Sequence, residues 1–267
     1  MDNAGSRTIH DFGEQWAFHS ENTGYYASVE LMQDMFGPLL STKDLEGARC
    51  GDIGSGTGRI VRMLLDAGAV HVVAVEPSDG VEQLRENTAD VADRVQIIHG
   101  GGEQLPPNSD LDLITSIGVL QFIPQPGPVA SAAYRALKPG GRFVIWVYAM
   151  EGMRVYVSLV TALRSVTTRL PHAALSAVCE FLTAILDTYM WMCRWLPLPL
   201  RSYVRGTLAR TTRDVRKVTI YDQLNPTYVR YHRRHEVEAL LTSAGFTDVQ
   251  LHHRRGYSWS AVGTKPV

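Results

Sequence analysis

Residues 50–60 read CGDIGSGTGRI, in which an apolar segment with one acid runs into glycines at every second position. A turn from a strand into a helix needs small residues where backbone N–H groups must approach a polar or anionic ligand at the helix N-terminus. Gly54, Gly56 and Gly58 supply these small residues. The stretch therefore predicts the first strand, the nucleotide-binding turn and the first helix of a doubly wound α/β sheet.

The spacing of these glycines departs from two common nucleotide-binding turns. A dinucleotide turn of the pattern G-x-G-x-x-G that starts at Gly54 requires a small residue at position 59, where Arg59 stands. A P-loop requires Gly-Lys followed by Ser or Thr, and no such triplet follows Gly58. The observed pattern, G-x-G-x-G, argues against both.

Glu76 ends the second apolar run, 76 − 58 = 18 residues beyond the last glycine of the turn. A carboxylate at this place accepts two hydrogen bonds from a ribose diol and repels a 2′-phosphate. The alternative interpretation is a cap for the helix predicted over PSDGVEQL (77–84). Together with the glycines, the spacing favours ribose binding, and it fits NAD or another adenosine-bearing cofactor.

Apolar runs rich in β-branched residues alternate with segments of helical period, which is typical of βαβ units and a parallel sheet. A helix predicted over 234–246 and two further runs close the pattern. We therefore predict an α/β fold with a doubly wound, seven-stranded, mostly parallel sheet that a helical insertion interrupts. The predicted strands cover 48–53, 71–76, 95–100, 111–116, 142–149, 247–253 and 257–263.

Composition fits one large globular domain. The chain has 267 residues, of which 45% are hydrophobic and 20% charged, and its net charge of −1 indicates neither a nucleic-acid partner nor a disordered tail. The three cysteines are widely spaced and form no C-x-x-C pair. The first residues are polar, without the basic and apolar regions of a secretory signal. We expect a cytoplasmic protein.

Five ordered motifs resemble the class I S-adenosylmethionine-dependent methyltransferases. They are GDIGSGTGRI (51–60), VVAVEPSDG (72–80), GGGEQLP (100–106), LDLITSIGVLQFIP (111–124) and ALKPGGRFVIW (136–146). The resemblance covers roughly residues 45–150, and the closing helix and strands of 234–265 agree with it in kind. It implies a Rossmann-like fold, S-adenosylmethionine as cofactor and S-adenosylhomocysteine as product.

The resemblance also implies roles for residues of the first two motifs. Asp52 is expected to orient the glycine loop or the amino group of the cofactor's methionine part. Gly54, Ser55, Gly56 and Gly58 are expected beneath the methionine and ribose parts, and Glu76 is expected to bind the ribose hydroxyls.

The later motifs imply the rest of the cofactor site. The family commonly has an acid one place after the first glycine of the third motif, where this chain has Gly101, so Gly102 and Glu103 are the adenine-side candidates. Ser116 and Ile117 are expected to face the cofactor. Gln121 stands where many relatives have histidine; an amide can form hydrogen bonds there but cannot act as a base.

Missing motifs narrow the acceptor class. Enzymes that methylate nucleobase amines typically carry Asn/Asp-Pro-Pro-aromatic after the fourth strand, and this chain has none. The segment 116–119 also lacks the carboxylates that a hard metal cation requires, so no metal is predicted. We predict a small, partly apolar acceptor, with O-methylation ahead of N- or C-methylation. A protein that binds the cofactor as a scaffold, or for another reaction, stays open, and a dehydrogenase is a distant third.

Candidates for a catalytic base lie in IYDQLNPTYVRYHRRHEVEALL (220–241), where tyrosines, an aspartate and histidines cluster. His232 is the first candidate because imidazole titrates near neutrality, against the alternative of an exposed histidine in a basic stretch. Tyr228 either orients the acceptor or packs after Pro226. His19 is a secondary candidate for the base.

Three parts of the chain are predicted from these patterns. Residues 1–44 form a helical segment that covers the cofactor site in related enzymes, residues 45–150 and 221–267 form the methyltransferase domain, and residues 151–220 form a helical insertion. The insertion carries ten Lys or Arg against four acids, a net charge of 10 − 4 = +6. Acids and arginines interrupt its apolar runs, so no transmembrane segment is predicted. A cap over the acceptor, a homodimer interface and a peripheral membrane contact all stay open.

Overall fold

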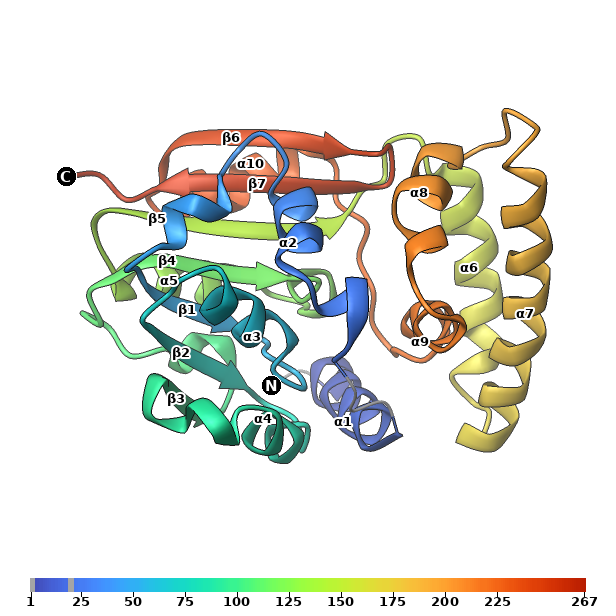
Figure 1. Cartoon of the computed structure of the whole chain (residues 1–267), viewed down its shortest axis with the longest axis horizontal. Coiled ribbons are helices and arrows are strands. Elements are labelled where there is room, and N and C mark those ends of the chain that lie inside the picture. Colours follow the sequence, from blue (N-terminus) through green and yellow to red (C-terminus); the bar gives the residue numbers. More distant parts are fainter. Residues whose placement is uncertain (1–2, 19–21) are drawn as a thin grey trace.

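The computed structural model, which describes residues 3–18 and 22–267, has a seven-stranded sheet of order β3-β2-β1-β4-β5-β7-β6 (Figure 1). Strands β1 to β5 are parallel, and β7 runs antiparallel to both β5 and β6. This confirms the predicted doubly wound, mostly parallel sheet. The strands are β1 (Arg49–Ile53), β2 (His71–Glu76), β3 (Val95–His99), β4 (Leu111–Ile117), β5 (Leu137–Tyr148), β6 (Thr247–Arg254) and β7 (Ser258–Thr264).

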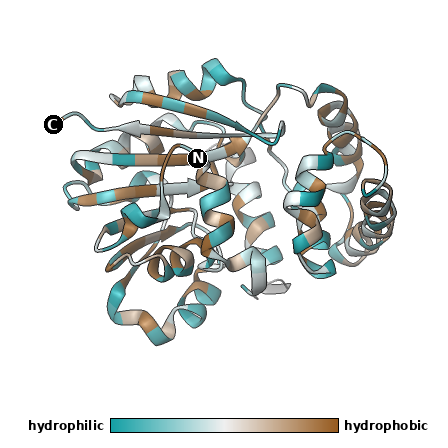
Figure 2. Ribbon diagram, turned by 45° about the horizontal axis from the view of Figure 1, so that its top comes forward, coloured by the Kyte–Doolittle hydropathy of each residue, from teal (hydrophilic) through white to brown (hydrophobic). Residues whose placement is uncertain are grey.

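Helices cover both faces of the sheet. Five α-helices pack on these faces, and short 3-10 helices lie in the connections. The strands between the helices are rich in hydrophobic residues (Figure 2). One buried cluster joins the sheet to α5 and α10, and a second joins its other face to α2 and α3. The elements are α2 (Val29–Phe36), α3 (Arg59–Asp66), α4 (Val81–Asn87), α5 (Gly127–Ala136) and α10 (Arg234–Ser243), with η1 (Gly24–Ala27), η2 (Thr42–Leu45), η3 (Ala89–Arg94), η4 (Gly102–Gln104) and η5 (Leu120–Phe122).

The register of the central strands brings three loops to one edge of the sheet. Cys50 of β1 pairs with Val72 of β2 on one side and with Leu113 of β4 on the other. Because these strands are parallel, their carboxyl ends meet, and the loops that follow them face the same crevice. The loops after β1, β2 and β4 therefore form one wall.

Helix α1 (Asn3–Phe18) crosses this edge of the sheet and joins it to the insertion (Figure 1). The amide of Asn225 donates to the carbonyl oxygen of Asp11 at 2.9 Å, and the hydroxyl of Thr227 donates to the Asp11 carboxylate at 2.8 Å. On its other side, α1 packs Trp16 against the loop that holds Gly56. The helix lies between the glycine loop and the segment after residue 224.

The insertion is a helical unit beside the sheet, built from α6 (Arg154–Thr167), α7 (His172–Met192), α8 (Arg201–Gly206), η6 (Leu208–Arg210) and α9 (Arg213–Leu224). Its α6, α7 and α9 share a buried cluster of their own that includes Val160, Cys179 and Tyr221. The predicted boundary at residue 220 falls inside α9, which continues because Tyr221 and Leu224 are buried in that cluster. The unit therefore ends four residues later than predicted.

Within the described residues, one helix is long and apolar enough to cross a membrane by length and composition, namely α7.

Candidate active site

The glycine loop after β1 has backbone geometry that only glycine adopts easily. Gly54 has φ +74° and Gly56 has φ +52°, both in the left-handed region. A Cβ on Gly54 would lie 2.5 Å from side-chain atoms of Val119. The N–H groups of Gly54 and Ser55 donate to the carbonyl oxygen of Val75 at 2.8 and 3.1 Å. The loop is thus fastened to the end of β2 and presents backbone rather than side chains.

Glu76 links the glycine loop to the loop after β2. One carboxylate oxygen accepts a hydrogen bond from the Gly56 N–H at 2.7 Å, and the other accepts from the Ser78 N–H at 2.9 Å. The residue is buried, and burial raises the pKa of its carboxyl group. Glu76 also lines the cavity described below, so it both shapes the loops and faces the space between them.

Asp52 lies beneath the glycine loop. One of its oxygens accepts from the Thr115 hydroxyl at 2.7 Å, and the other has no hydrogen-bond partner among the described residues. Burial raises the pKa of its carboxyl group to about 6. Asp52 does not line the cavity, so its position suits it to support the loop.

A single large cavity of about 1870 Å³ runs from the glycine loop to the insertion. Pockets for one drug-sized ligand usually measure roughly 300–1,000 Å³, so this cavity has room for two ligands side by side. Its first wall comes from the loops after β1 to β4. The residues of this cofactor wall are Gly54, Ser55, Gly56, Glu76, Pro77, Gly101, Gly102, Glu103, Ile117 and Gly118.

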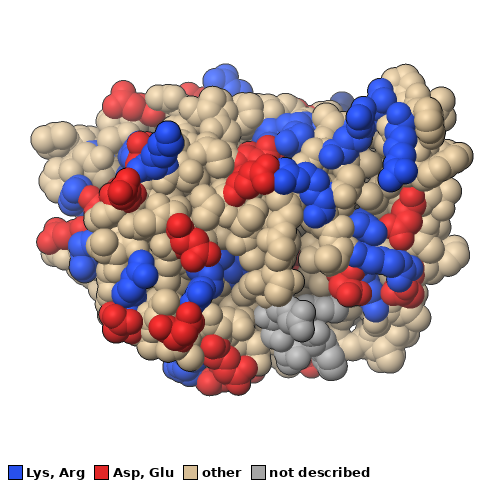
Figure 3. Space-filling model, in the orientation of Figure 1, with Lys and Arg blue, Asp and Glu red and all other residues tan. Residues whose placement is uncertain are grey.

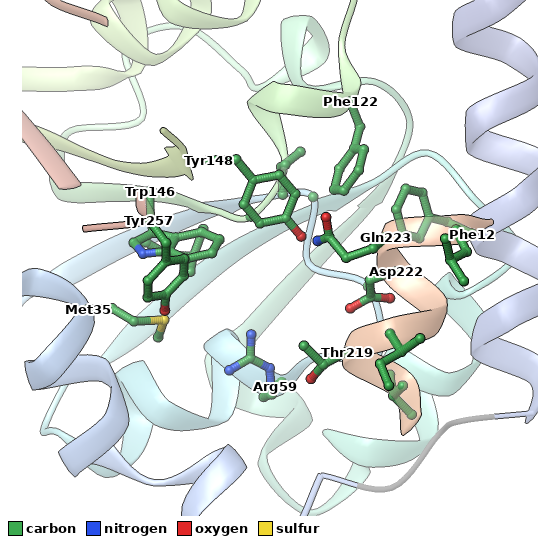
Figure 4. A pocket seen from close by; sticks show the side chains of 18 of the residues that line it. Phe12, Met35, Arg59, Phe122, Trp146, Tyr148, Thr219, Asp222, Gln223 and Tyr257 are labelled. Carbon is green, nitrogen blue, oxygen red and sulfur yellow. The ribbon is translucent and has the colours of Figure 1, made fainter. Parts of the chain in front are cut away.

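The second wall is rich in aromatic and aliphatic side chains (Figure 4). They come from α6 to α9, the end of β5, the turn between β6 and β7, and residues 225–233 between α9 and α10, which we call the return segment. Tyr148 stacks on Tyr231 with ring centroids 5.6 Å apart and meets Trp146 edge-on at 5.5 Å. The ring centroids of Tyr203 and Tyr257 lie 4.2 Å apart. The residues of this acceptor wall include Trp146, Tyr148, Met153, Tyr156, Leu159, Leu186, Tyr203, Val218, Thr219, Asp222, Gln223, Tyr231 and Tyr257.

Asp222 on α9 brings a carboxylate into this mostly apolar wall. It accepts a hydrogen bond from the side-chain amide of Gln15 on α1 and lies near Tyr148 and Arg59 (Figure 4). Desolvation raises the pKa of its carboxyl group from 3.8 to about 6, although the Gln15 hydrogen bond and the Arg59 charge act in the opposite direction. A carboxylate with such a pKa exchanges protons near neutral pH.

The structure places the predicted cofactor residues in two groups. Gly54, Ser55, Gly56, Glu76, Gly102, Glu103 and Ile117 line the cavity, whereas Asp52, Gly58, Ser116 and Gln121 do not. Gly58 packs towards Leu84 of α4. The Ser116 hydroxyl lies 3.4 Å from the Ile53 carbonyl oxygen, which it faces within the sheet. Gln121 is fully buried, and its backbone oxygen accepts from the Arg230 N–H at 2.8 Å.

His232, the first candidate for the base, does not line the large cavity, because its side chain faces away from it. The segment is extended here, with a β-bridge between Ala149 and His232, so neighbouring side chains point to opposite sides. Tyr231 lines the large cavity, and His232 lines a separate small pocket with Arg230 and Glu236. Burial lowers the pKa of His232 to about 4.

Tyr228, for which orientation of the acceptor and packing after Pro226 both stood open, does not line the cavity either. Its N–H donates to the hydroxyl of Thr8 at 3.1 Å, because this segment is held against α1. His19 lies outside the described residues.

Sequence reasoning missed Asp222, Tyr148 and Trp16 as site residues. Asp222 stands in the predicted Tyr/His cluster, but its place on a buried helix face depends on where α9 packs. Trp16 lines the cavity and contacts the glycine loop. Within 3–18 and 22–267, no three His, Cys, Asp or Glu side chains gather as a metal site.

Comparison with known proteins agrees with this geometry. Residues 51–145 match the family model for a methyltransferase domain. The demethylmenaquinone methyltransferase of Clavibacter sepedonicus is 35% identical over 100 residues, which are 37% of this chain and 40% of that protein. The ubiquinone/menaquinone biosynthesis C-methyltransferase UbiE of Methylobacterium nodulans is 34% identical over 98 residues, which are 35% of this chain and 39% of that protein.

A solved structure matches over nearly the whole chain. Human N-acetylserotonin methyltransferase in complex with S-adenosylmethionine aligns with a TM-score of 0.51 and 14% identity, over 99% of this chain and 57% of that chain, which shows the shared fold. The chain spans about two fifths of the curated relatives named above. The matched domain, the strand order and the glycine loop agree: residues 51–145 form a methyltransferase domain, and the sheet has the Rossmann-like order of class I S-adenosylmethionine-dependent methyltransferases.

Proposed function

We propose that this protein transfers a methyl group from S-adenosylmethionine to a hydroxyl oxygen of a small, partly apolar metabolite, without a metal ion. The observation that carries the proposal is the continuity of one cavity from the glycine loop to an aromatic wall that holds Asp222. Donor and acceptor need only be aligned in such a space, because positioning supplies much of the rate enhancement in a direct displacement.

The cofactor wall suits S-adenosylmethionine. Gly54 and Gly56 keep the loop free of side chains, and Glu76 turns a carboxylate towards the place where a ribose diol would bind. We propose Gly102 and Glu103, which both line the cavity, as the residues on the adenine side, and Trp16 of α1 contacts the glycine loop. We propose that α1 covers the bound cofactor and that the insertion caps the acceptor.

The acceptor wall favours a flat, partly apolar molecule. Tyr148, Trp146 and Tyr231 offer ring faces and edges, and aromatic rings prefer stacked or edge-on neighbours. The two curated relatives act, by their names, on demethylmenaquinone and in ubiquinone and menaquinone biosynthesis. Their names and these rings together support a ring-bearing acceptor.

Asp222 is the residue that we assign as general base. When bound, S-adenosylmethionine supplies a methyl group already activated on a sulfonium sulfur. Asp222 accepts the proton from the acceptor hydroxyl, and Gln15 holds the carboxylate in place. Arg59, which lines the same cavity, offsets the negative charge that develops on the acceptor oxygen. The aromatic wall excludes water from this proton transfer.

C-methylation is the second candidate, because one of the relatives carries C-methyltransferase in its name. A base beside an activated ring carbon can take the ring proton just as it takes a hydroxyl proton. We keep the cytoplasm as the proposed location, which the three free, buried cysteines support.

Methyl transfer can be tested directly with methyl-labelled S-adenosylmethionine and a panel of phenols, hydroquinones, aromatic amines and carboxylic acids. We expect label in a methyl ether of a phenol or hydroquinone, identified by mass and by the chemical shift of the new methyl group. Label on ring carbon would support the second candidate. Tight cofactor binding without transfer to any panel member would favour the scaffold alternative, and preference for NAD would overturn the cofactor assignment.

A further inference from the structure

The outer face of α7, which points away from the sheet, carries no charge along the whole helix. Helix α7 has 21 residues, about 30 Å at the usual rise, and its exposed residues fall within roughly 120° of arc. These residues, which we call the outer face of α7, are Ala173, Ala177, Phe181, Ala184, Ile185, Thr188 and Trp191. Phe181 is 67% exposed and Trp191 is 61% exposed. A surface helix normally turns charged residues to water, so this face is built to be covered.

The acids of α7 lie beside this arc rather than within it, and they fasten the helix to α9. Glu180 pairs with Arg213 and Lys217, and Asp187 pairs with Arg216 at 3.0 Å. These partners all belong to α9. Although α7 is long enough to span a bilayer, these ion pairs hold it flat against α9. The surface therefore suits a helix that lies along a boundary between water and lipid.

The C-terminal end of α7 adds tryptophans and arginines. Trp195 is 75% exposed and Leu196 is 49% exposed, directly after Arg194. Arg194 and Arg205 are exposed and form no ion pair with any described residue. Between residues 191 and 213 the sequence has arginines but no Asp or Glu. Blue side chains gather at this end of the insertion in Figure 3.

We propose that the outer face of α7, with Trp195, Leu196 and the arginines beside them, docks the protein on an anionic lipid bilayer. Tryptophan is enriched at the level of lipid headgroups, where one side of the ring is apolar and the other meets water. Arginines near the surface are attracted by anionic lipids. Docking in this pose also brings Pro199 and Leu200, which line the cavity, to the lipid surface. A lipid-soluble acceptor would then enter there, a consequence that rests on the proposed function.

A second copy of the chain is a poorer occupant of this face. Arg169, which is exposed, lies three residues before α7, and Arg194 lies two residues after it. Antiparallel pairing of two α7 helices would bring Arg169 towards the partner's Arg194, and parallel pairing would bring each arginine towards its own copy. Either arrangement places like charges together. An anionic surface instead attracts the arginines at both ends of α7.

Vesicle flotation tests this docking without any methyl acceptor. The full chain is mixed with vesicles of phosphatidylcholine alone, or of phosphatidylcholine and phosphatidylglycerol in equal parts. We expect the wild type to float with the anionic vesicles and much less with the neutral ones. The double substitution Trp191→Ser and Trp195→Ser should lower the affinity at least tenfold, and Arg194→Gln with Arg205→Gln should lower it on the order of tenfold.

Matched controls remove the same kinds of residue elsewhere. Val70→Ser changes a half-exposed apolar residue far from α7, and Arg135→Gln changes an exposed arginine of α5; both should float like the wild type. Unchanged S-adenosylmethionine binding by every variant shows that the fold is intact. The proposal is overturned if the wild type ignores anionic vesicles, or if the tryptophan variant floats as well as the wild type. It is also overturned if the wild type is a dimer that this variant turns into a monomer. Each of these outcomes is independent of whether methyl transfer is found.

Discussion

The two walls of the cavity differ in which part of the chain lines them, backbone or side chains. The cofactor wall is mostly backbone: Gly54, Gly56 and Gly102 end or follow parallel strands, and a Cβ at Gly54 or Gly102 would come within 2.5 Å of a neighbour. The acceptor wall is mostly large side chains, carried by helices that pack into clusters of their own. Backbone fixed by a sheet tolerates little change, whereas helix-borne side chains can vary in size and polarity. In the proposed function, the sheet therefore holds the donor and the insertion surrounds the acceptor.

This contrast predicts that changes in the two walls have separable effects. A change in the cofactor wall should alter the dissociation constant of S-adenosylmethionine. A change in the acceptor wall should alter turnover and leave that constant nearly as it is.

The largest expected effect is that of Asp222→Asn on turnover. An amide cannot take the acceptor proton, and loss of a general base typically costs about 10²–10⁴-fold in rate. We expect kcat to fall by this amount while the S-adenosylmethionine dissociation constant, measured by calorimetry, stays unchanged. Asp66→Asn, at the exposed end of α3 and outside the cavity, is the matched control. Normal turnover in the Asp222 variant would return the role of base to another group.

Glu76→Gln should produce the next largest effect, on the other wall. It removes the charge that would meet the ribose hydroxyls, and lost hydrogen bonds to a charged group cost roughly 1–3 kcal/mol. We expect the cofactor to bind about ten- to a hundredfold more weakly. Glu86 is an exposed acid of α4, the helix that follows β2. The control variant Glu86→Gln should bind the cofactor as the wild type does. An unchanged dissociation constant for the Glu76 variant would remove this residue from the cofactor site.

His232→Ala should have little effect on either wall. The side chain is buried outside the cavity, and its lowered pKa keeps the ring neutral near pH 7. We expect the free energy of unfolding to drop by roughly 1–2 kcal/mol, as for many buried substitutions, with turnover close to that of the wild type. Urea unfolding and steady-state kinetics measure the two quantities. A large loss of turnover at normal cofactor affinity would contradict the geometry of this segment.

The cofactor wall was largely predictable from the sequence because its signals are local. The glycine spacing and the position of Glu76 at the end of β2 depend on one strand, one turn and the next strand. The predicted residues that do not line the cavity are those whose side-chain orientation depends on contacts with distant parts of the chain. Ser116 and Gln121 are buried, and neither of them lines the cavity.

The acceptor wall could not be predicted residue by residue, because many segments that are far apart in the sequence build it. Tyr148 ends β5, Asp222 lies on α9 and Tyr231 lies in the return segment. Whether Tyr231 or its neighbour His232 faces the cavity depends on the bridge that pairs the return segment with Ala149. A shift of one residue in an extended chain exchanges the two sides. The sequence selected the 220–241 segment, and tertiary pairing decides which of its residues face the cavity.

The smallest predicted effect tests how α1 acts on the base. The folded-state pKa of Asp222 is raised from 3.8 to about 6, and the Gln15 hydrogen bond is one of the influences that lower it. Since only the carboxylate accepts a proton, turnover should fall as the pH drops through about 6. The same shift makes the folded state relatively more stable below pH 4, and this stability is lost as the pH rises through about 6.

Gln15→Met removes the donor and keeps the length of the side chain. Without this hydrogen bond the carboxylate is less favoured, so the pKa rises and the acidic limb of the pH–rate profile should move upward by about one unit or less. His10→Ala changes an exposed residue of the same helix and should leave the pH–rate profile unchanged. If the limb stays fixed in the Gln15 variant while its cofactor affinity is normal, then Asp222 is not the group that titrates. If the acidic limb moved to lower pH instead, Gln15 would stabilise the protonated form of Asp222. That would contradict the pKa-lowering effect that we assign to this hydrogen bond.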